Sequence, residues 1–185
     1  MKTIKILLFA LLPFCGLQNI YAQESSFKKH CISAEESKLY RLIIEYRKEK
    51  RLPEIPLSKS LSYVARQHVV DMDINLKTMT HAWSTCKYNP NDSKTFKCMW
   101  LKPSELTHYK ANGYECVFSI SGGGATAQDA LNAWKKSPNH NNVITNKSIW
   151  KDMKWNALGV GIYKNYAAIW FGEDKDEEDT PVVCE

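Results

Sequence analysis

In residues Ala130–Asn146, ALNAWKKSPNHNNVITN, a helical pattern stops and then restarts. Apolar residues recur at the spacing of one helical face up to Trp134, and the same spacing returns from His140 onward. Between the two runs, Ser137 and Pro138 interrupt the helix. The sequence therefore predicts two consecutive helices, with His140 on the inner face of the second. Such a histidine serves as a ligand, as a proton carrier or as a hydrogen-bonded core residue.

Two earlier helices are predicted on the N-terminal side. Ser33–Glu36 has the pattern of a capping box, in which a hydroxyl and a carboxylate each accept from a backbone amide. Two prolines in the segment 51–58, RLPEIPLS, end the first helix and predict an extended crossover. Ser58 or Ser60 then caps a second helix. Its inner face includes His68, which this pattern alone identifies as a structural histidine.

Two strands are predicted at the end of the patterned region. Ala157–Tyr163 alternates large apolar residues, predicted to point inward, with small residues, predicted to point outward. Tyr166–Phe171 repeats the alternation, and Lys164 and Asn165 form the turn between them. Helices that come first and a hairpin that comes last predict an α+β domain, a sheet with helices against it.

The region between the second helix and Ala130 carries polar residues that need an explanation. Residues 79–109 form a long irregular stretch that contains His81, and a loop of this length is usually functional or stapled. Ala111–Ile120 is a short apolar run with Glu115 inside it. A carboxylate in such a run needs a partner, because burying it unpaired is expensive. Thr126 begins the helix that leads to His140.

The first 22 residues have the pattern of an export signal. Lys2 and Lys5 precede an apolar run, and the segment ends in a small residue. We therefore predict a cleaved signal peptide over residues 1–22 and a secreted or periplasmic protein. A lipid anchor on Cys15 is an alternative, although the small residues of a lipidation site do not precede it. No transmembrane segment is expected, since no apolar run reaches the roughly 18 residues that a membrane span needs.

Export permits disulfides, and five cysteines follow the signal: Cys31, Cys86, Cys98, Cys116 and Cys184. Cys86 and Cys98 bracket a polar loop, and bridging them would remove about 3 kcal/mol of loop entropy from the unfolded chain. Cys31 and Cys184 lie just outside the two ends of the patterned region, so a second bridge there would tie down both termini. Cys116 is left as a buried free thiol. No two cysteines are separated by only two residues, which argues against a cysteine zinc site.

Charge is unevenly distributed along the chain. The net charge at pH 7 is +5, but residues 173–185 hold seven acids against Lys175 alone. Residues 23–172 hold 22 Lys and Arg against 13 Asp and Glu, so the body is basic and the tail acidic. Two interpretations follow, a surface drawn to acidic polymers or membranes and a solvated lysine-rich exterior. No nucleic-acid motif is present, and we expect a monomer without a nucleic-acid partner.

Five segments together resemble a known family. The segments are, in order, ARQHVVDM followed by His81, GYE, AWKKSPNH, LGVGIY and AAIWFG. Together they resemble the bacterial branch of the CAP superfamily, whose domain is also called SCP. That superfamily comprises cysteine-rich secretory proteins, antigen 5 and pathogenesis-related 1 proteins. The resemblance covers residues 34–172, leaving residues 23–33 as a lead and 173–185 as an acidic tail. It implies a three-layer α-β-α sandwich with a central, mainly antiparallel sheet.

The resemblance also implies a cavity. It places His81, Glu115 and His140 at positions that, in some members, hold a divalent metal such as zinc. Two imidazoles and one carboxylate would leave an open position for water, whose pKa zinc lowers toward neutrality. We therefore predict these three residues as cavity and candidate metal-binding residues.

Two further cavity residues and two departures follow from the resemblance. His68 matches a histidine that bacterial members often carry, which adds a cavity role to the structural one. Ser137 stands where animal members carry a second glutamate, so it is a cavity residue without an acid. Cys116 stands where Asn usually follows the first glutamate.

Three functions remain open at this stage. The first is a secreted binding module whose His- and Glu-lined groove holds an unknown lipid, glycan or protein, with aromatic side chains from Trp83, Trp100, Tyr114 and Trp134. The second is a metal-assisted extracellular hydrolase. The third is a scaffold that binds acidic surfaces. The sequence has neither a Gly-x-Ser-x-Gly segment nor a His-Glu-x-x-His helix, so we assign no catalytic residue.

Overall fold

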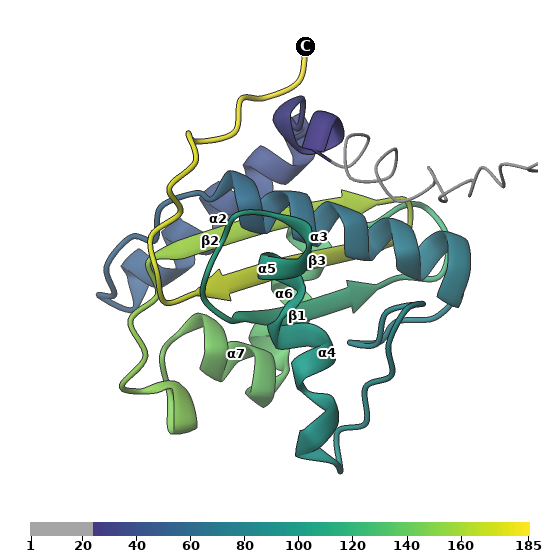
Figure 1. Cartoon of the computed structure of the whole chain (residues 1–185). Coiled ribbons are helices and arrows are strands. Elements are labelled where there is room, and N and C mark those ends of the chain that lie inside the picture. The colour runs from purple at the N-terminus through teal and green to yellow at the C-terminus, as the bar shows by residue number, and fades with distance from the viewer. Residues whose placement is uncertain (1–23) are drawn as a thin grey trace, which may run out of the picture.

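The computed structural model describes residues 24–185. The signal peptide predicted for residues 1–22 and the alternative lipid anchor on Cys15 lie outside the described residues. Among the residues that are described, no helix is long and apolar enough to cross a membrane. Figure 1 shows the described chain as a sheet held between helices.

A three-stranded antiparallel sheet lies at the centre of the fold. The strands are β1 (Gly113–Ser119), β2 (Ala157–Tyr163) and β3 (Tyr166–Gly172), in the order β1-β3-β2. The predicted hairpin is confirmed, because Tyr163 pairs with Tyr166 across the turn. Strand β1 reaches the sheet from far along the chain and pairs with β3, which places Glu115 opposite Trp170.

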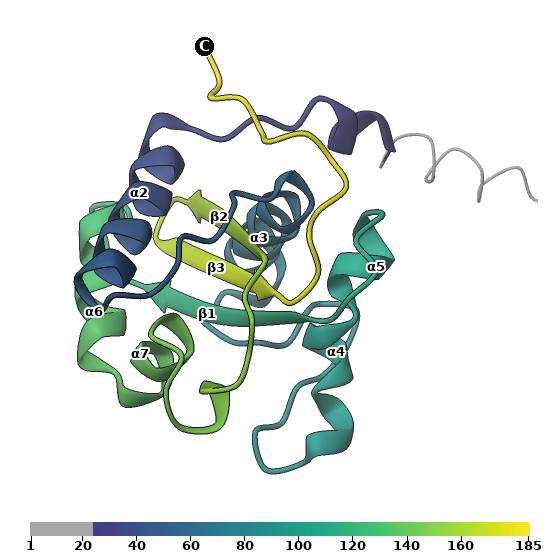
Figure 2. The same ribbon diagram turned by 90° about the vertical axis from the view of Figure 1, so that its left-hand side faces the viewer.

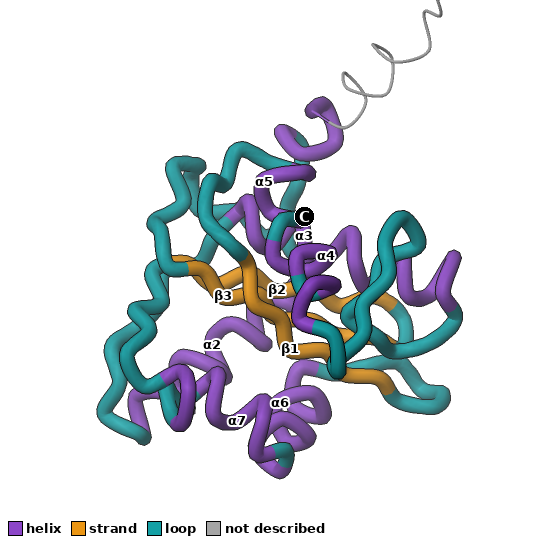
Figure 3. The backbone as a smooth tube through the Cα atoms, turned by 60° about the horizontal axis from the view of Figure 1, so that its bottom comes forward, coloured by secondary structure: helices purple, strands orange, loops and turns teal. Residues whose placement is uncertain are grey.

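Helices cover both faces of the sheet, so the predicted three-layer α-β-α sandwich is confirmed. Figure 3 shows one helical layer below the sheet and another above it. The layer below consists of α2 (Ala34–Glu49), α6 (Ala127–Lys136) and α7 (Pro138–Ile144). The layer above consists of α3 (Lys59–Asp71), α4 (Lys97–Trp100) and α5 (Lys102–Leu106). The two consecutive helices predicted around Ser137 are therefore present as α6 and α7.

The alternating residues of β2 face different layers. Leu158 and Val160 point into the core shared with α2 and α6, as predicted. The small residues between them do not point to solvent, and that prediction is wrong. A Cβ on Gly159 would lie 2.1 Å from the Leu61 backbone, so the glycines face α3 instead. Small residues are needed here because helix and strand backbones are in close contact.

Local signals set where the helices begin. Ser33 accepts from the Glu36 amide at 3.1 Å and Glu36 accepts from the Ser33 amide at 2.6 Å, which confirms the capping box. Ser58 caps α3 by accepting from the Leu61 amide at 2.9 Å. Past its end, α3 continues as a short π-helix, η1 (Met72–Leu76).

Both predicted disulfides are present. Cys31 is bonded to Cys184 and Cys86 to Cys98, whereas Cys116 is free and buried. The loop closed by Cys86 and Cys98 is more regular than predicted, since it contains the 3-10 helix η2 (Ser93–Thr95) and the start of α4. The Cys86–Cys98 disulfide therefore closes a loop that is partly helical.

The acidic tail packs against the rest of the protein. Asp176 accepts hydrogen bonds from the Ser58 hydroxyl at 2.6 Å and from the amide and hydroxyl of Ser60, both at 2.8 Å. A carboxylate at the first turn of α3 is favourable because the amide groups there have no partner within the helix. Further along, Ile32 and Val183 form a parallel bridge beside the Cys31–Cys184 disulfide.

Candidate ligand-binding cavity

A cavity of about 650 Å³ opens beside the β1 edge of the sheet. Its walls come from α7, from residues 80–90 before α4, and from the 3-10 helix η3 (Ser148–Trp150). In Figure 2, α7 and α4 both lie past β1, away from β2. Four of the five predicted cavity residues line it: His81, Glu115, Ser137 and His140.

Glu115 lies deepest in this group, with a fully buried side chain on β1. One of its oxygens contacts Nδ1 of His68, and the other lies 2.8 Å from Nδ1 of His81. Burial alone would raise the pKa of Glu115, but the charges and hydrogen bonds of the two histidines outweigh burial and lower it to about 2. The partner predicted for this buried carboxylate is thus a pair of imidazoles.

His68 lies behind Glu115 and does not line the cavity, which corrects its predicted cavity role. It is 0 % exposed. Its Nε2 lies 2.9 Å from the carbonyl oxygen of Ala82, and since a carbonyl only accepts, Nε2 must carry a proton. Nδ1 donates to the Glu115 carboxylate, so the ring is an imidazolium, stacked on Trp83 at 4.4 Å. Burial opposes this charge, but Glu115 outweighs burial and raises the pKa of His68.

His81 and His140 present their imidazoles to the cavity from different elements. His81 belongs to the segment after η1, and its side chain is 25 % exposed. Its ring packs edge to face on Tyr88 at 5.2 Å. His140 lies on α7, where burial and the nearby charge of His81 lower its pKa, partly opposed by Glu115. His140, predicted to lie on the inner face of its helix, therefore faces the cavity.

The fold and this group of side chains match a known family. Residues 40–171, most of the chain, match the family model CAP, described as the cysteine-rich secretory protein family. The chain belongs to the cysteine-rich secretory protein family. A comparison with curated proteins gave no match.

Solved structures with a fold similar to this chain include three bacterial proteins. An extracellular protein with an SCP domain from Bacillus anthracis is 18% identical, with a TM-score of 0.58 over 76% of this chain and 40% of that one. An outer surface protein from Borrelia burgdorferi is 21% identical, with a TM-score of 0.56 over 79% and 98%. A cysteine-rich secretory protein from Staphylococcus aureus is 16% identical, with a TM-score of 0.51 over 76% and 39%. This chain thus spans about 40% of the first and third proteins.

The metal predicted from the CAP resemblance can be tested against the donor set. Both oxygens of Glu115 already accept from imidazoles, and Nδ1 of His81 is one of those partners. Among residues 24–185, no three His, Cys, Asp or Glu side chains form a group that could hold a metal ion. As arranged, these residues do not fit a three-ligand zinc site. Zinc binding by His81, Glu115 and His140 stays a prediction.

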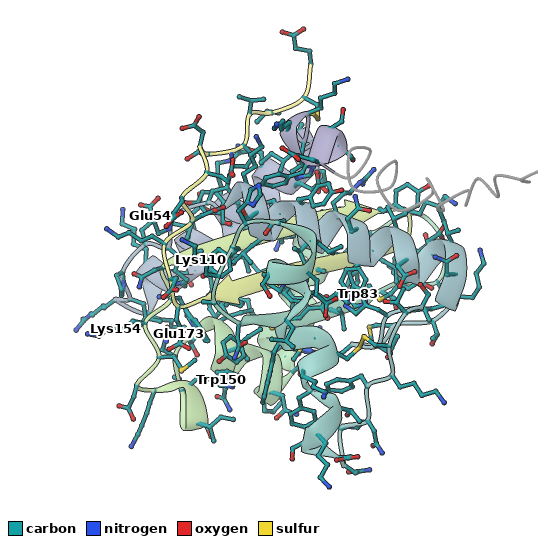
Figure 4. The ribbon with its side chains drawn as sticks, viewed as in Figure 1. Glu54, Trp83, Lys110, Trp150, Lys154 and Glu173 are labelled. Carbon is teal, nitrogen blue, oxygen red and sulfur yellow. A yellow bond between two sulfur atoms is a disulfide. The ribbon has the colours of Figure 1, made fainter. Side chains whose placement is uncertain are left out.

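The aromatic side chains of this CAP cavity differ from those predicted. Of the four, only Tyr114 lines it. Trp134 is core and donates from Nε1 to the Val117 carbonyl at 2.9 Å, and Trp83 lies against His68. Trp150 packs with the layer of α2 and α6, whereas Trp83 packs with the layer of α3 on the other face of the sheet, and Figure 4 labels both residues. Trp150 and Tyr88 line the cavity but were missed, because both belong to segments without a periodic pattern.

A buried arginine supports one wall and was also missed. Arg47 donates from Nη1 to the Ile144 carbonyl and to Oδ1 of Asn146, both at 2.7 Å. Asn146 in turn donates to the backbone carbonyls of Trp150 at 3.3 Å and Met153 at 2.8 Å. Arg47 follows the apolar face of α2 in helical register, which was the available signal for its burial.

Proposed function

We propose that this CAP protein is an exported, non-catalytic binding module that takes its ligand in the cavity between α7, η3 and residues 80–90. The observation that carries the proposal is the state of Glu115. Both of its oxygens are engaged by imidazoles, so the carboxylate positions His81 and does not act as a free base. A cavity of about 650 Å³ has the size of a small-molecule site.

The hydrolase alternative has less support. Covalent hydrolysis needs a nucleophile within hydrogen-bond reach of a base. Among the described residues, the Ser137 side chain makes no capping hydrogen bond and none to His140. The third hypothesis, a scaffold for acidic surfaces, is supported only by the net positive charge of residues 23–172, and no observation at this site favours it.

Two features support export. The first is the signal pattern of residues 1–22, and the second is the pair of disulfides, which persist in oxidising compartments. A divalent metal is compatible with the proposal without being required by it.

Saturation-transfer NMR tests the binding proposal with three probe sets: lauric acid, soluble oligosaccharides and a tryptic peptide mixture, each with and without zinc. We expect at least one set to bind, and the variant His140→Ala/Asn142→Ala to lose that binding. His108→Ala/Asn132→Ala changes the same residue types outside the cavity and should retain it. Binding that survives the cavity substitutions, or binding by no set, would contradict the proposal. Chelator-sensitive turnover of any probe would favour the hydrolase.

A further inference from the structure

We propose that the ligand of this cavity is a neutral carbohydrate, bound with a sugar ring against Trp150 and its hydroxyls on the α7 and η3 side chains. The inference rests on the proposed function and narrows it to one ligand class. Its evidence is the chemistry of the cavity lining.

The charge of the lining argues for a neutral ligand. No lysine or arginine lines the cavity in the described part of the chain. Glu115, the carboxylate of the lining, is already balanced by the two histidines that contact it. A phosphate or a fatty-acid head group placed here would find no lysine or arginine, and an ammonium would find only a carboxylate that two imidazoles already engage.

Unused hydrogen-bonding groups argue for a ligand rich in hydroxyls. Within the described residues, six polar side chains of the lining make no hydrogen bond to another residue: Tyr88, Ser137, Asn139, His140, Asn142 and Ser148. An acyl chain bound over them would displace the water on these groups without replacing its hydrogen bonds, at a cost of about 1–3 kcal/mol for each buried group. Sugar hydroxyls both donate and accept, as these amides and hydroxyls do.

The aromatic residues supply the apolar part of such a site. Tyr114 and Trp150 pack edge to face at 5.3 Å, and Trp155 backs both rings, at 5.4 and 5.7 Å. On the segment before α4, Tyr88 is stacked on Phe96 at 5.2 Å. A pyranose ring has a C–H face and a rim of hydroxyls, so it matches a lining that combines flat apolar rings with polar side chains. An acyl chain matches only the rings.

The wall that carries Trp150 is fixed before a ligand arrives. Asn146 holds the Trp150 and Met153 carbonyls and is itself held by buried Arg47. Ile149 projects from the same short helix and is 81 % exposed, forming an apolar lip. A rigid aromatic wall loses little conformational entropy on binding, which favours affinity for a weakly interacting ligand such as a sugar.

Titration of five neutral hexasaccharides, those of cellulose, chitin, starch, xylan and mannan, tests the proposal by calorimetry and tryptophan fluorescence. We expect at least one to bind and to change the fluorescence. Trp150→Ala should weaken that binding by about tenfold or more, as for an aromatic anchor at a binding site. Asn142→Ala should weaken it by several-fold, while Asn132→Ala on the outer face of α6 should leave it unchanged.

The other outcomes are also decisive. Binding by none of the five sugars, or binding that neither substitution weakens, overturns the carbohydrate proposal. If Trp150→Ala does not fold, Asn142→Ala carries the test alone. Lauric acid or a peptide bound in the cavity without a sugar would overturn this inference and leave the binding-module proposal standing. If no sugar, lauric acid or peptide bound in the cavity, both the carbohydrate proposal and the binding-module proposal would be wrong.

Discussion

Arg47 and Asn146 are 99 residues apart in the sequence, yet the guanidinium of one donates to the side-chain carbonyl of the other at 2.7 Å. Arg47 is 1 % exposed, and its other hydrogen bonds go to the carbonyls of Pro53 and Ile144. Burial lowers the pKa of Arg47 to about 10. The first long helix is thereby tied to the loop that carries Trp150, so stability and cavity shape depend on the same side chain.

Replacing this arginine should weaken the fold. Arg47→Leu removes the donor to the buried Ile144 carbonyl and to two partly buried acceptors, the Pro53 carbonyl and the Asn146 side chain, at an expected cost of about 3 kcal/mol of unfolding free energy. Urea unfolding measures the loss. Arg41→Leu, on the exposed side of the same helix, should change the unfolding free energy by less than about 0.5 kcal/mol. Equal effects of the two substitutions would refute the role of Arg47.

The buried pair of His68 and Glu115 predicts a stability maximum in mildly acidic solution. The pKa of Glu115 is lowered from 4.5 to about 2, so its contribution is present above about pH 4.5 and is lost as the pH falls toward 2. The pKa of His68 is raised from 6.5, so its contribution is present below about pH 6.5 and is lost as the pH rises through the raised value. The pair therefore stabilises most between these limits.

Glu115→Gln tests that pair, because it keeps the shape of the side chain and removes the charge. We expect the variant to lose about 2–3 kcal/mol near pH 5.5 and less toward either extreme. Unfolding free energies measured across the pH range, relative to Glu45→Gln on the exposed face of α2, would show this bell-shaped difference. A difference that does not vary with pH would mean that the pair is not charged.

The tail carboxylate Asp176 should behave as part of the α3 cap. Asp176→Ala removes the acceptor of three hydrogen bonds from Ser58 and Ser60, and we expect a loss of about 1–2 kcal/mol. Thermal unfolding provides the measurement. Asp179→Ala, an exposed acid three residues further on, should leave the melting temperature nearly unchanged. If the tail acted only through its net negative charge, Asp176→Ala and Asp179→Ala would change the melting temperature equally.

Gly161 should tolerate no side chain. A Cβ there would lie 2.5 Å from the Ala65 carbonyl carbon and 2.6 Å from the Arg66 amide nitrogen, both backbone atoms of α3. We expect Gly161→Ala to lose more than about 3 kcal/mol or to fail to fold. Gly123→Ala meets nothing within 4 Å but has a φ of +79°, so it should cost about 1 kcal/mol. Circular dichroism and urea unfolding would rank the two variants, and the reverse order would be evidence against close contact of α3 with β2.

Short-range patterns were enough for the long helices, the β2–β3 hairpin and part of the site, but not for α4 and α5, which lie in the stretch 79–109 predicted to be irregular. The capping box at Ser33, the break at Ser137 and the β2–β3 turn depend on neighbouring residues, and all three were predicted. Glu115 was recognised as needing a partner because it lies in an apolar run. Which imidazoles would meet it depended on β1 pairing with β3 beneath α3, and here the resemblance to CAP proteins supplied His81.

Interactions between distant residues account for what was missed. Arg47 bonds to carbonyls in other segments, and no local pattern shows where those carbonyls lie. Trp150 belongs to a three-residue helix, too short for any periodicity. His68 was placed on the inner face of its helix correctly, but only the Ala82 carbonyl and the Glu115 carboxylate show that its ring lies behind the cavity.

The sequence was enough for the helix caps, the break at Ser137 and the alternation of β2 and β3, because these signals act between residues close in the chain. Which face of each strand meets a helix depends on how the layers pack, and the glycines of β2 proved to lie in contact with α3. The tertiary structure also decided which polar side chains of the cavity remain without a partner. Those properties arise when two helical layers close on one sheet, and each depends on residues too far apart in the chain for any local pattern to relate.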